Sequence, residues 1–163
     1  QQCGSRVDKY IGDAVMAVWI HGSQHIAEDE VLRILQALQE IHQMTEQLQT
    51  QFSLPFPLRV GAGINTGYAM VGNTGSGDRP DYTALGDTVN AAFRLESSTK
   101  QIKTDVALGV ETYRYVKKYF PDYAEVLTEN TVQLKGYEST TLAYTCSFAT
   151  LDEKISVPEL SQA

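Results

Sequence analysis

An amphipathic segment of unusual length, residues 27–52, most constrains how this chain can fold. Its apolar residues recur at steps of three and four with Gln and Glu between them, which is the pattern of a helix with one apolar side. Pro55 and Pro57 follow and end the pattern. A helix of this length needs an apolar surface to cover, so we expect the other segments to form one.

Most of those other segments have the pattern of short strands. Two β-favouring stretches flank Gly12 and Asp13, and this pair predicts a hairpin turn. Residues 15–20 are nearly all apolar, so we expect that strand to be covered on both faces. Further strands are predicted at 58–65, 68–72, 82–85, 106–108 and 124–127, and a last hairpin pairs 132–134 with 142–146.

Two shorter helices complete the pattern. We expect one at 88–99, with Asp87 as its N-cap, and another at 111–118. The sum is an α/β (α+β) domain in which helices pack on a largely antiparallel sheet. The domain is expected to span residues 1–148, and the polar residues 149–163 are expected to form a flexible C-terminal tail.

Composition excludes several classes of function. The 163 residues carry 13 Lys and Arg against 20 Asp and Glu, a net charge of −7 that argues against binding to nucleic acid or to anionic membranes. No apolar run is long enough to span a bilayer, so we expect no membrane segment in this chain. Cys3 and Cys146 lack the spacing of a metal site and indicate reduced thiols in a cytoplasmic protein.

Asp13 is the first candidate for chemistry. A carboxylate at a tight hairpin turn, beside a glycine that permits close backbone approach, is well placed to bind a hard divalent cation. Aspartate is also common in turns without any ligand. From spacing alone, the turn interpretation is the stronger of the two.

The second candidate is a pair of side chains in the helix predicted after Gly86. Asn90 and Arg94 are four residues apart and share one helix face, where an amide and a guanidinium together suit a developing phosphate charge. The alternative is a solvated face on which Arg94 pairs with a nearby acid. The glycines at 61–63 and 72–77 match neither a P-loop nor a dinucleotide fingerprint, and bulges and turns account for them better.

Taken together, four segments occur in an order that is more specific than any of them alone: 9–17, 60–72, 81–96 and 134–136. With them, residues 7–146 resemble the catalytic domain of the class III nucleotidyl cyclases, in its bacterial or soluble-type form. The resemblance implies a ferredoxin-like domain that forms a head-to-tail homodimer with its active sites at the interface. It also implies two Mg²⁺ or Mn²⁺ ions per site.

The resemblance assigns a role to each candidate residue. Asp13 matches the second of two metal-binding aspartates, while Asn90 and Arg94 match the pair that orients the ribose and stabilises the transition state. Lys9 and Thr83 match the two positions that select the base. A lysine ammonium only donates hydrogen bonds, which suits N1 of adenine but not the protonated N1 of guanine. The expected reaction is therefore conversion of ATP to 3′,5′-cyclic AMP and pyrophosphate by an adenylate cyclase.

Some features depart from the family pattern. Tyr68 and Tyr137 stand where some members have triphosphate-binding basic residues, so the resemblance assigns no triphosphate ligand here. The family's opening strand and helices, with the first metal aspartate, are expected to precede Gln1, so that the chain as given would have little activity. The alternatives are a guanylate cyclase, disfavoured by Lys9 and Thr83, and an inactive nucleotide-binding regulatory module.

Overall fold

The computed structural model describes residues 5–11, 13–22, 25–73, 82–133 and 140–154. Within these ranges, only the backbone is described at 6–11, 71, 73, 82–85 and 153–154. The elements follow in the order β1 (Arg6–Ile11), β2 (Ala14–Val18), α1 (Glu28–Phe52), β3 (Ala62–Ile64), β4 (Met70–Asn73), β5 (Tyr82–Leu85), α2 (Asp87–Gln101), β6 (Val106–Leu108), α3 (Val110–Tyr119), α4 (Pro121–Glu125), β7 (Thr128–Gln133), β8 (Thr140–Cys146) and α5 (Phe148–Lys154).

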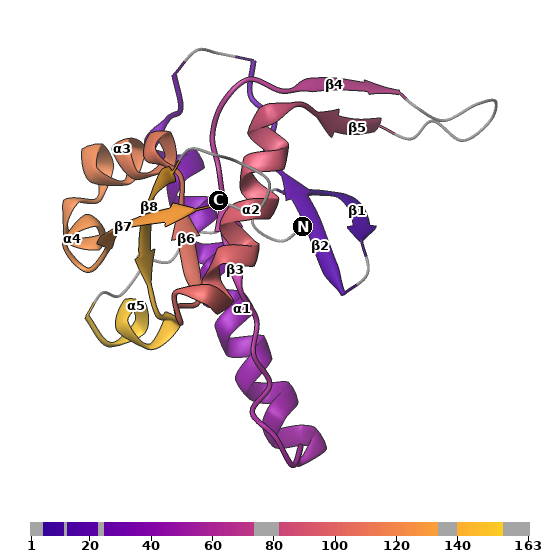
Figure 1. Cartoon of the computed structure of the whole chain (residues 1–163), viewed down its shortest axis with the longest axis vertical. Coiled ribbons are helices and arrows are strands. Elements are labelled where there is room, and N and C mark those ends of the chain that lie inside the picture. The colour runs from indigo at the N-terminus through magenta and orange to yellow at the C-terminus, as the bar shows by residue number, and fades with distance from the viewer. Residues whose placement is uncertain (1–4, 12, 23–24, 74–81, 134–139, 155–163) are drawn as a thin grey trace.

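A four-stranded sheet forms the centre of the molecule, in the order β3-β6-β8-β7 (Figure 1). Strand β3 runs parallel to β6, whereas β6 and β7 both run antiparallel to β8. The β7–β8 pair includes the closing hairpin that the sequence predicts, with Val132 opposite Thr141. The predicted fold class, helices on a mostly antiparallel sheet, is confirmed.

Strand β6 shows how the core is divided between the two faces of this sheet. Val106 and Leu108 point to one face, where they join apolar residues from α1, α3, α4 and α5. Ala107 lies between them in sequence and packs on the other face with Leu95 of α2. Because alternate residues of a strand face opposite sides, this three-residue strand separates two helical layers and is itself fully covered.

Helix α1 occupies almost the range that its apolar period predicts. Val31, Leu35 and Leu38 are buried in the larger core cluster. The second half of the helix extends away from the sheet (Figure 1), and there its apolar residues Met44 and Phe52 are 58% and 63% exposed. The apolar stripe therefore packs on the domain only along the first half of the helix.

The expectation of a flexible tail from residue 149 is wrong for its first part, because residues 148–154 form helix α5. Phe148 and Leu151 are buried in the larger core cluster. The His42 ring of α1 stacks on Phe148, with ring centroids 5.2 Å apart, and its Nδ1 shares a hydrogen bond with the Asp152 carboxylate. The sequence after residue 148 is mostly polar, and the burial of Leu151 next to Phe148 is why these residues form a packed helix and not a tail. Residues 155–163 lie outside the described part of the chain.

Two other predictions are also wrong in detail. Residues 124–127 do not form a strand: α4 ends at Glu125, and the strand begins at Thr128. Pro121 at the start of α4 is favourable, because the first helical residue needs no amide donor. Strand β2 is not covered on both faces, since its exposure alternates and Val15 is 58% exposed. Within the described residues β2 pairs with β1 alone, and the alternation of its exposed residues shows that one of its faces is open to solvent.

Candidate active site

The β1–β2 hairpin carries the candidate metal ligand. The strands pair antiparallel with Ile11 opposite Ala14, so Asp13 lies in the connecting turn, and its side chain is exposed. Lys9 of β1 is opposite Met16 of β2, just after an irregularity in the register between Val7 and Lys9. The side chain of Lys9 and all of Gly12 lie outside the described residues. The predicted hairpin is confirmed, whereas the roles of its residues stay predictions.

Helix α2 carries Asn90 and Arg94 on successive turns. Asn90 is exposed in the first turn and Arg94 is half-buried in the next, so the two positions share one face as the sequence predicts. Asp87 is not the N-cap: it is the first helical residue, and the N-cap is Gly86, with no side-chain cap. Gly86 has φ +131°, a conformation that side chains strongly disfavour, and its carbonyl accepts the amides of Val89 and Asn90 at 3.1 Å.

Strand β3 of the central sheet packs closely against helix α2 at Gly63. A Cβ added to Gly63 would lie 2.5 Å from the carbonyl oxygen of Ala92 and 2.9 Å from Cα of Glu96. No other residue type can occupy this position without moving the helix. The sequence analysis placed Gly63 among bulges and turns, but the structure places it at a direct contact between two backbones.

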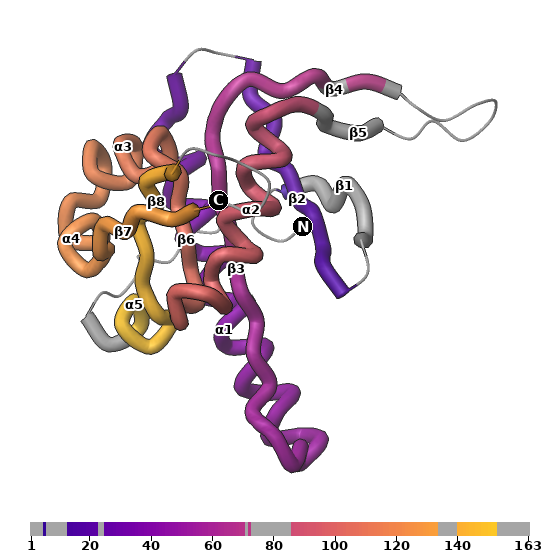
Figure 2. Tube along the Cα trace, viewed as in Figure 1, coloured from indigo at the N-terminus to yellow at the C-terminus, as the bar shows by residue number. Residues whose placement is uncertain are grey.

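Thr83 lies on β5, opposite Gly72 of β4, and its side chain is outside the described part of the chain. Strand β5 contacts both β1 and α2, and Gly86 alone separates it from the helix in the chain. Strand β5 therefore contacts two of the elements that hold predicted site residues. Figure 2 shows helix α2 beside β3, with which it makes close contacts. The motif at 134–136 and the loop at 74–81 lie outside the described residues.

The candidate metal site has a suitable donor, but one carboxylate is not a complete set of ligands. Mg²⁺ and Mn²⁺ bind carboxylate oxygens, and the exposed Asp13 supplies that chemistry. In the described ranges, no group of three or more His, Cys, Asp or Glu residues could hold an ion. Asp13 therefore fits as one ligand of an ion, in a set that the described residues of one chain do not complete.

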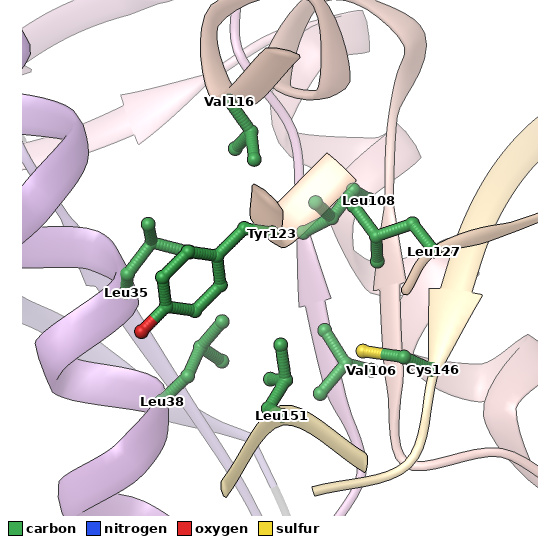
Figure 3. Close-up of a pocket in the computed structure, with 9 residues that line it drawn as sticks. All are labelled: Leu35, Leu38, Val106, Leu108, Val116, Tyr123, Leu127, Cys146 and Leu151. Atoms are coloured by element: carbon green, nitrogen blue, oxygen red, sulfur yellow. The ribbon is translucent and has the colours of Figure 1, made fainter. Parts of the chain in front are cut away.

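A cavity lies in the larger core, away from these residues, and is lined almost wholly by apolar side chains (Figure 3). Burial raises the pKa of the Cys146 thiol, and of the Tyr123 hydroxyl with help from the Asp152 charge, to about 12 in both cases. Both groups are neutral at physiological pH, and a buried neutral thiol is a poor nucleophile. The cavity is a packing feature of the core.

The sequence analysis did not assign two residues that bond beside the candidate pair. The Asn65 amide donates to the carbonyl of Thr88 at 3.0 Å, and the Thr88 hydroxyl donates to the carbonyl of Tyr68 at 2.6 Å. The sequence analysis has Asn65 as the last residue of the predicted strand 58–65 and Thr88 as the first residue of the predicted helix 88–99. Neither bond has a local sequence signal, because each joins residues about twenty positions apart.

Comparisons with known proteins show which family this chain resembles. The family model of the adenylate and guanylate cyclase catalytic domain matches residues 3–147. An adenylate cyclase of Anabaena cylindrica is 31% identical over 144 residues, which are 88% of this chain and 28% of that protein. The chain thus spans less than a third of the length of this curated relative.

Two solved structures give the same result. The adenylyl cyclase CyaB from P. aeruginosa superposes with a TM-score of 0.64 at 28% identity, over 88% of this chain and 72% of that one. The guanylyl cyclase Cya2 superposes with a TM-score of 0.66 at 27% identity, over 88% and 70%. Fold and sequence together define a nucleotidyl cyclase domain. The chain belongs to the adenylate and guanylate cyclase catalytic domain family.

Proposed function

We propose that this domain is the catalytic domain of an adenylate cyclase, which converts ATP to 3′,5′-cyclic AMP and pyrophosphate. The observation that carries the proposal is the arrangement of the site elements. Strand β5, with Thr83, contacts both β1, the strand of Lys9 that leads into the Asp13 turn, and helix α2, with Asn90 and Arg94. Residues for base, metal and phosphate are thus distributed over the hairpin, β5 and α2 of each subunit. In the proposed homodimer, each site takes its metal ligand from one subunit and its base and phosphate contacts from the other.

Base selection rests on Lys9 and Thr83. The Lys9 ammonium donates to N1 of adenine, and the Thr83 hydroxyl accepts from the exocyclic amine. Guanine has a protonated N1, so the same lysine would face another donor and a buried polar group would stay unpaired. This chemistry favours ATP over GTP.

Cyclisation forms a bond between the ribose 3′ oxygen and the α-phosphorus, and it breaks the bond between the α-phosphorus and the bridging oxygen of the leaving pyrophosphate. Solvent takes up the proton of the 3′ hydroxyl. Asn90 orients the ribose, and Arg94 stabilises the negative charge that grows on the α-phosphoryl oxygens. Mg²⁺ or Mn²⁺ ions, two per site, would when bound lower the pKa of the 3′ hydroxyl and offset the charge of the leaving pyrophosphate. Asp13 would provide one of their ligands.

The functional unit in this proposal is a homodimer with shared sites. Large apolar side chains are exposed near the site elements, with Val15 58%, Tyr68 84% and Met70 78% accessible. Tyr68 and Met70 are two positions apart in the chain, and exposed apolar patches are typical of surfaces that bind another protein. No helix in the described ranges has both the length and the apolar character that a membrane crossing needs. We place the enzyme in the cytoplasm, where ATP is available.

A guanylate cyclase is the second candidate, and the likeness to the guanylyl cyclase Cya2 supports it. The deciding experiment incubates the full-length protein with Mn²⁺ and either ATP or GTP, and identifies the product by mass spectrometry. Cyclic AMP from ATP supports the proposal. Cyclic GMP as the main product supports the second candidate, and nucleotide binding without any product indicates a regulatory module.

A further inference from the structure

Two hydrogen bonds meet at Thr88 and tie the start of helix α2 to the segment between β3 and β4. The Asn65 amide donates to the Thr88 carbonyl at 3.0 Å, and the Thr88 hydroxyl donates to the Tyr68 carbonyl at 2.6 Å. Asn65 directly follows β3, and Tyr68 precedes β4 by two residues. We call these three residues the α2 clasp.

The clasp lies at the base of the β4–β5 hairpin. The ladder between these strands begins at its base with Met70 opposite Leu85. The bond between Tyr68 and Thr88 joins the same two chain segments just below that pair. In Figure 1 the hairpin extends away from the body of the domain, with helix α2 at its base. The clasp is therefore a contact through which the hairpin and the helix are held in one orientation.

The residues of the clasp are well suited to this task. The bond from Asn65 is partly buried, so solvent competes less for it than for an exposed bond, whereas the bond from Thr88 to Tyr68 is exposed and short. Asn65 sits at the end of β3, whose Gly63 backbone contacts α2 one to two turns further along. The helix is thus fixed to the sheet at Gly63 and fixed to the hairpin at Thr88.

We propose that Asn65 and Thr88 are positioning residues: they hold β5, which carries Thr83, in a fixed relation to Asn90 and Arg94. This inference rests on the proposed function, because it assumes that base contact and phosphate contact occur on β5 and α2. Misplacement of a reacting group by about 1 Å can reduce a rate by about a hundredfold. A clasp between the two elements would therefore affect both turnover and base discrimination.

The test compares Thr88→Val, which removes the hydroxyl and keeps the shape, with Thr88→Ser, which keeps the hydroxyl. Thr45→Val is the matched control, because the Thr45 hydroxyl also donates to a carbonyl, that of Ile41, but on the exposed part of α1. In the full-length protein we expect Thr88→Val to lower kcat at least tenfold and to reduce the preference for ATP over GTP. Thr88→Ser and Thr45→Val should retain both.

A second readout does not depend on activity. Amide hydrogen exchange at 70–73 and 82–90 should become at least tenfold faster in Thr88→Val and unchanged at 28–38. Asn65→Asp, which replaces the amide donor with an acceptor, should give the same local change if Thr88→Val fails to fold. Unchanged exchange in both variants would overturn the clasp, whatever the activity of the wild type.

The two readouts separate this inference from the proposed function. Faster exchange with an unchanged kcat and an unchanged ATP preference would overturn the positioning role. If the wild type forms no cyclic nucleotide, the proposed function fails, and the exchange data alone decide whether the clasp holds the hairpin to the helix. Parallel loss of protection, turnover and discrimination, restored by serine, is the result that we expect.

Discussion

The backbone of Gly63 packs directly against the backbone of Glu96. A Cβ on Gly63 would lie 2.9 Å from Cα of Glu96, and closer still to its amide nitrogen. This contact fixes helix α2 against the sheet between the turn that carries Asn90 and the end of the helix. The geometry of the proposed site therefore depends on a residue that contributes no side chain to it.

Gly63→Ala should consequently displace α2. We expect a loss of roughly 1–3 kcal/mol in the free energy of unfolding, as for other overpacked sites, and a loss of cyclase activity beyond what the unfolded fraction explains. Gly22→Ala is the control, because nothing lies within 4 Å of a Cβ at that position. Urea unfolding and product formation, measured on the same samples, check the prediction, and wild-type values for Gly63→Ala would contradict it.

Base selection should change with Lys9 and Thr83. The double variant Lys9→Glu, Thr83→Cys replaces a donor with an acceptor at the position facing N1, so it should use ATP much less efficiently. Its free energy of unfolding should change far less than kcat/KM for ATP. The ratio of kcat/KM for ATP and GTP is the measurement, and full retention of ATP use would remove Lys9 and Thr83 from the base site.

Asn90 and Arg94 should act in the transition state. Replacing either with Ala should lower kcat by about a hundredfold and change KM little, because their bonds strengthen as charge develops. Steady-state kinetics with ATP separate the two effects. A change in KM alone would indicate a role in binding.

Mixing variants tests whether the site is shared between subunits. Arg94→Ala and Asp13→Asn should each be nearly inactive, and their mixture should recover activity because a heterodimer contains one intact site. Recovery should depend on subunit exchange and reach no more than about half of the wild-type rate per dimer. A mixture as inactive as its components would contradict a shared site.

The stability of the domain should fall at alkaline pH. Burial raises the pKa of Cys146 from 9.0, and that of Tyr123 from 10.0, to about 12. Between those values the unfolded chain has released protons that the folded domain still holds, so the free energy of unfolding decreases as pH rises from about 9 to about 12. Urea unfolding at about pH 7.5 and about pH 10.5 should show this decrease.

Tyr123→Phe should reduce the alkaline loss. The variant removes one of the groups whose pKa is raised, and also a buried hydroxyl that has no hydrogen-bond partner within the described residues. At neutral pH the variant should be at least as stable as the wild type. On folding, the Tyr123 hydroxyl loses its hydrogen bond to water and gains no partner among the described residues, and Phe has no such group to desolvate. A clear loss of stability at neutral pH would mean that the hydroxyl has a partner.

The sequence predicts the elements well where local pattern decides them. Helix α1 begins within one residue of its predicted start, because apolar residues and two prolines define it. The β1–β2 hairpin also follows from local residues, Gly12 and Asp13. The site residues Asn90 and Arg94 fall on one helix face because their spacing alone determines it.

Long-range contacts could not be predicted in the same way. The sequence predicts a tail where helix α5 forms. The helix is stabilised by Phe148 and Leu151, which pack against α1 and the sheet, and this contact has no local sequence pattern. Strand β2 has the apolar run of a central strand, yet one face remains exposed. The bonds at Thr88 and the contact at Gly63 join residues far apart in sequence, so no local pattern reveals them.

A competition assay tests the central claim most directly. The full-length protein receives equal concentrations of ATP and GTP with Mn²⁺ in one reaction, and both cyclic products are quantified together, so that their ratio equals the ratio of kcat/KM values. An Arg94→Ala sample measures any background. The account predicts that cyclic AMP is the dominant product and that Arg94→Ala abolishes it. A dominant yield of cyclic GMP, or equal product from wild type and Arg94→Ala, would contradict it.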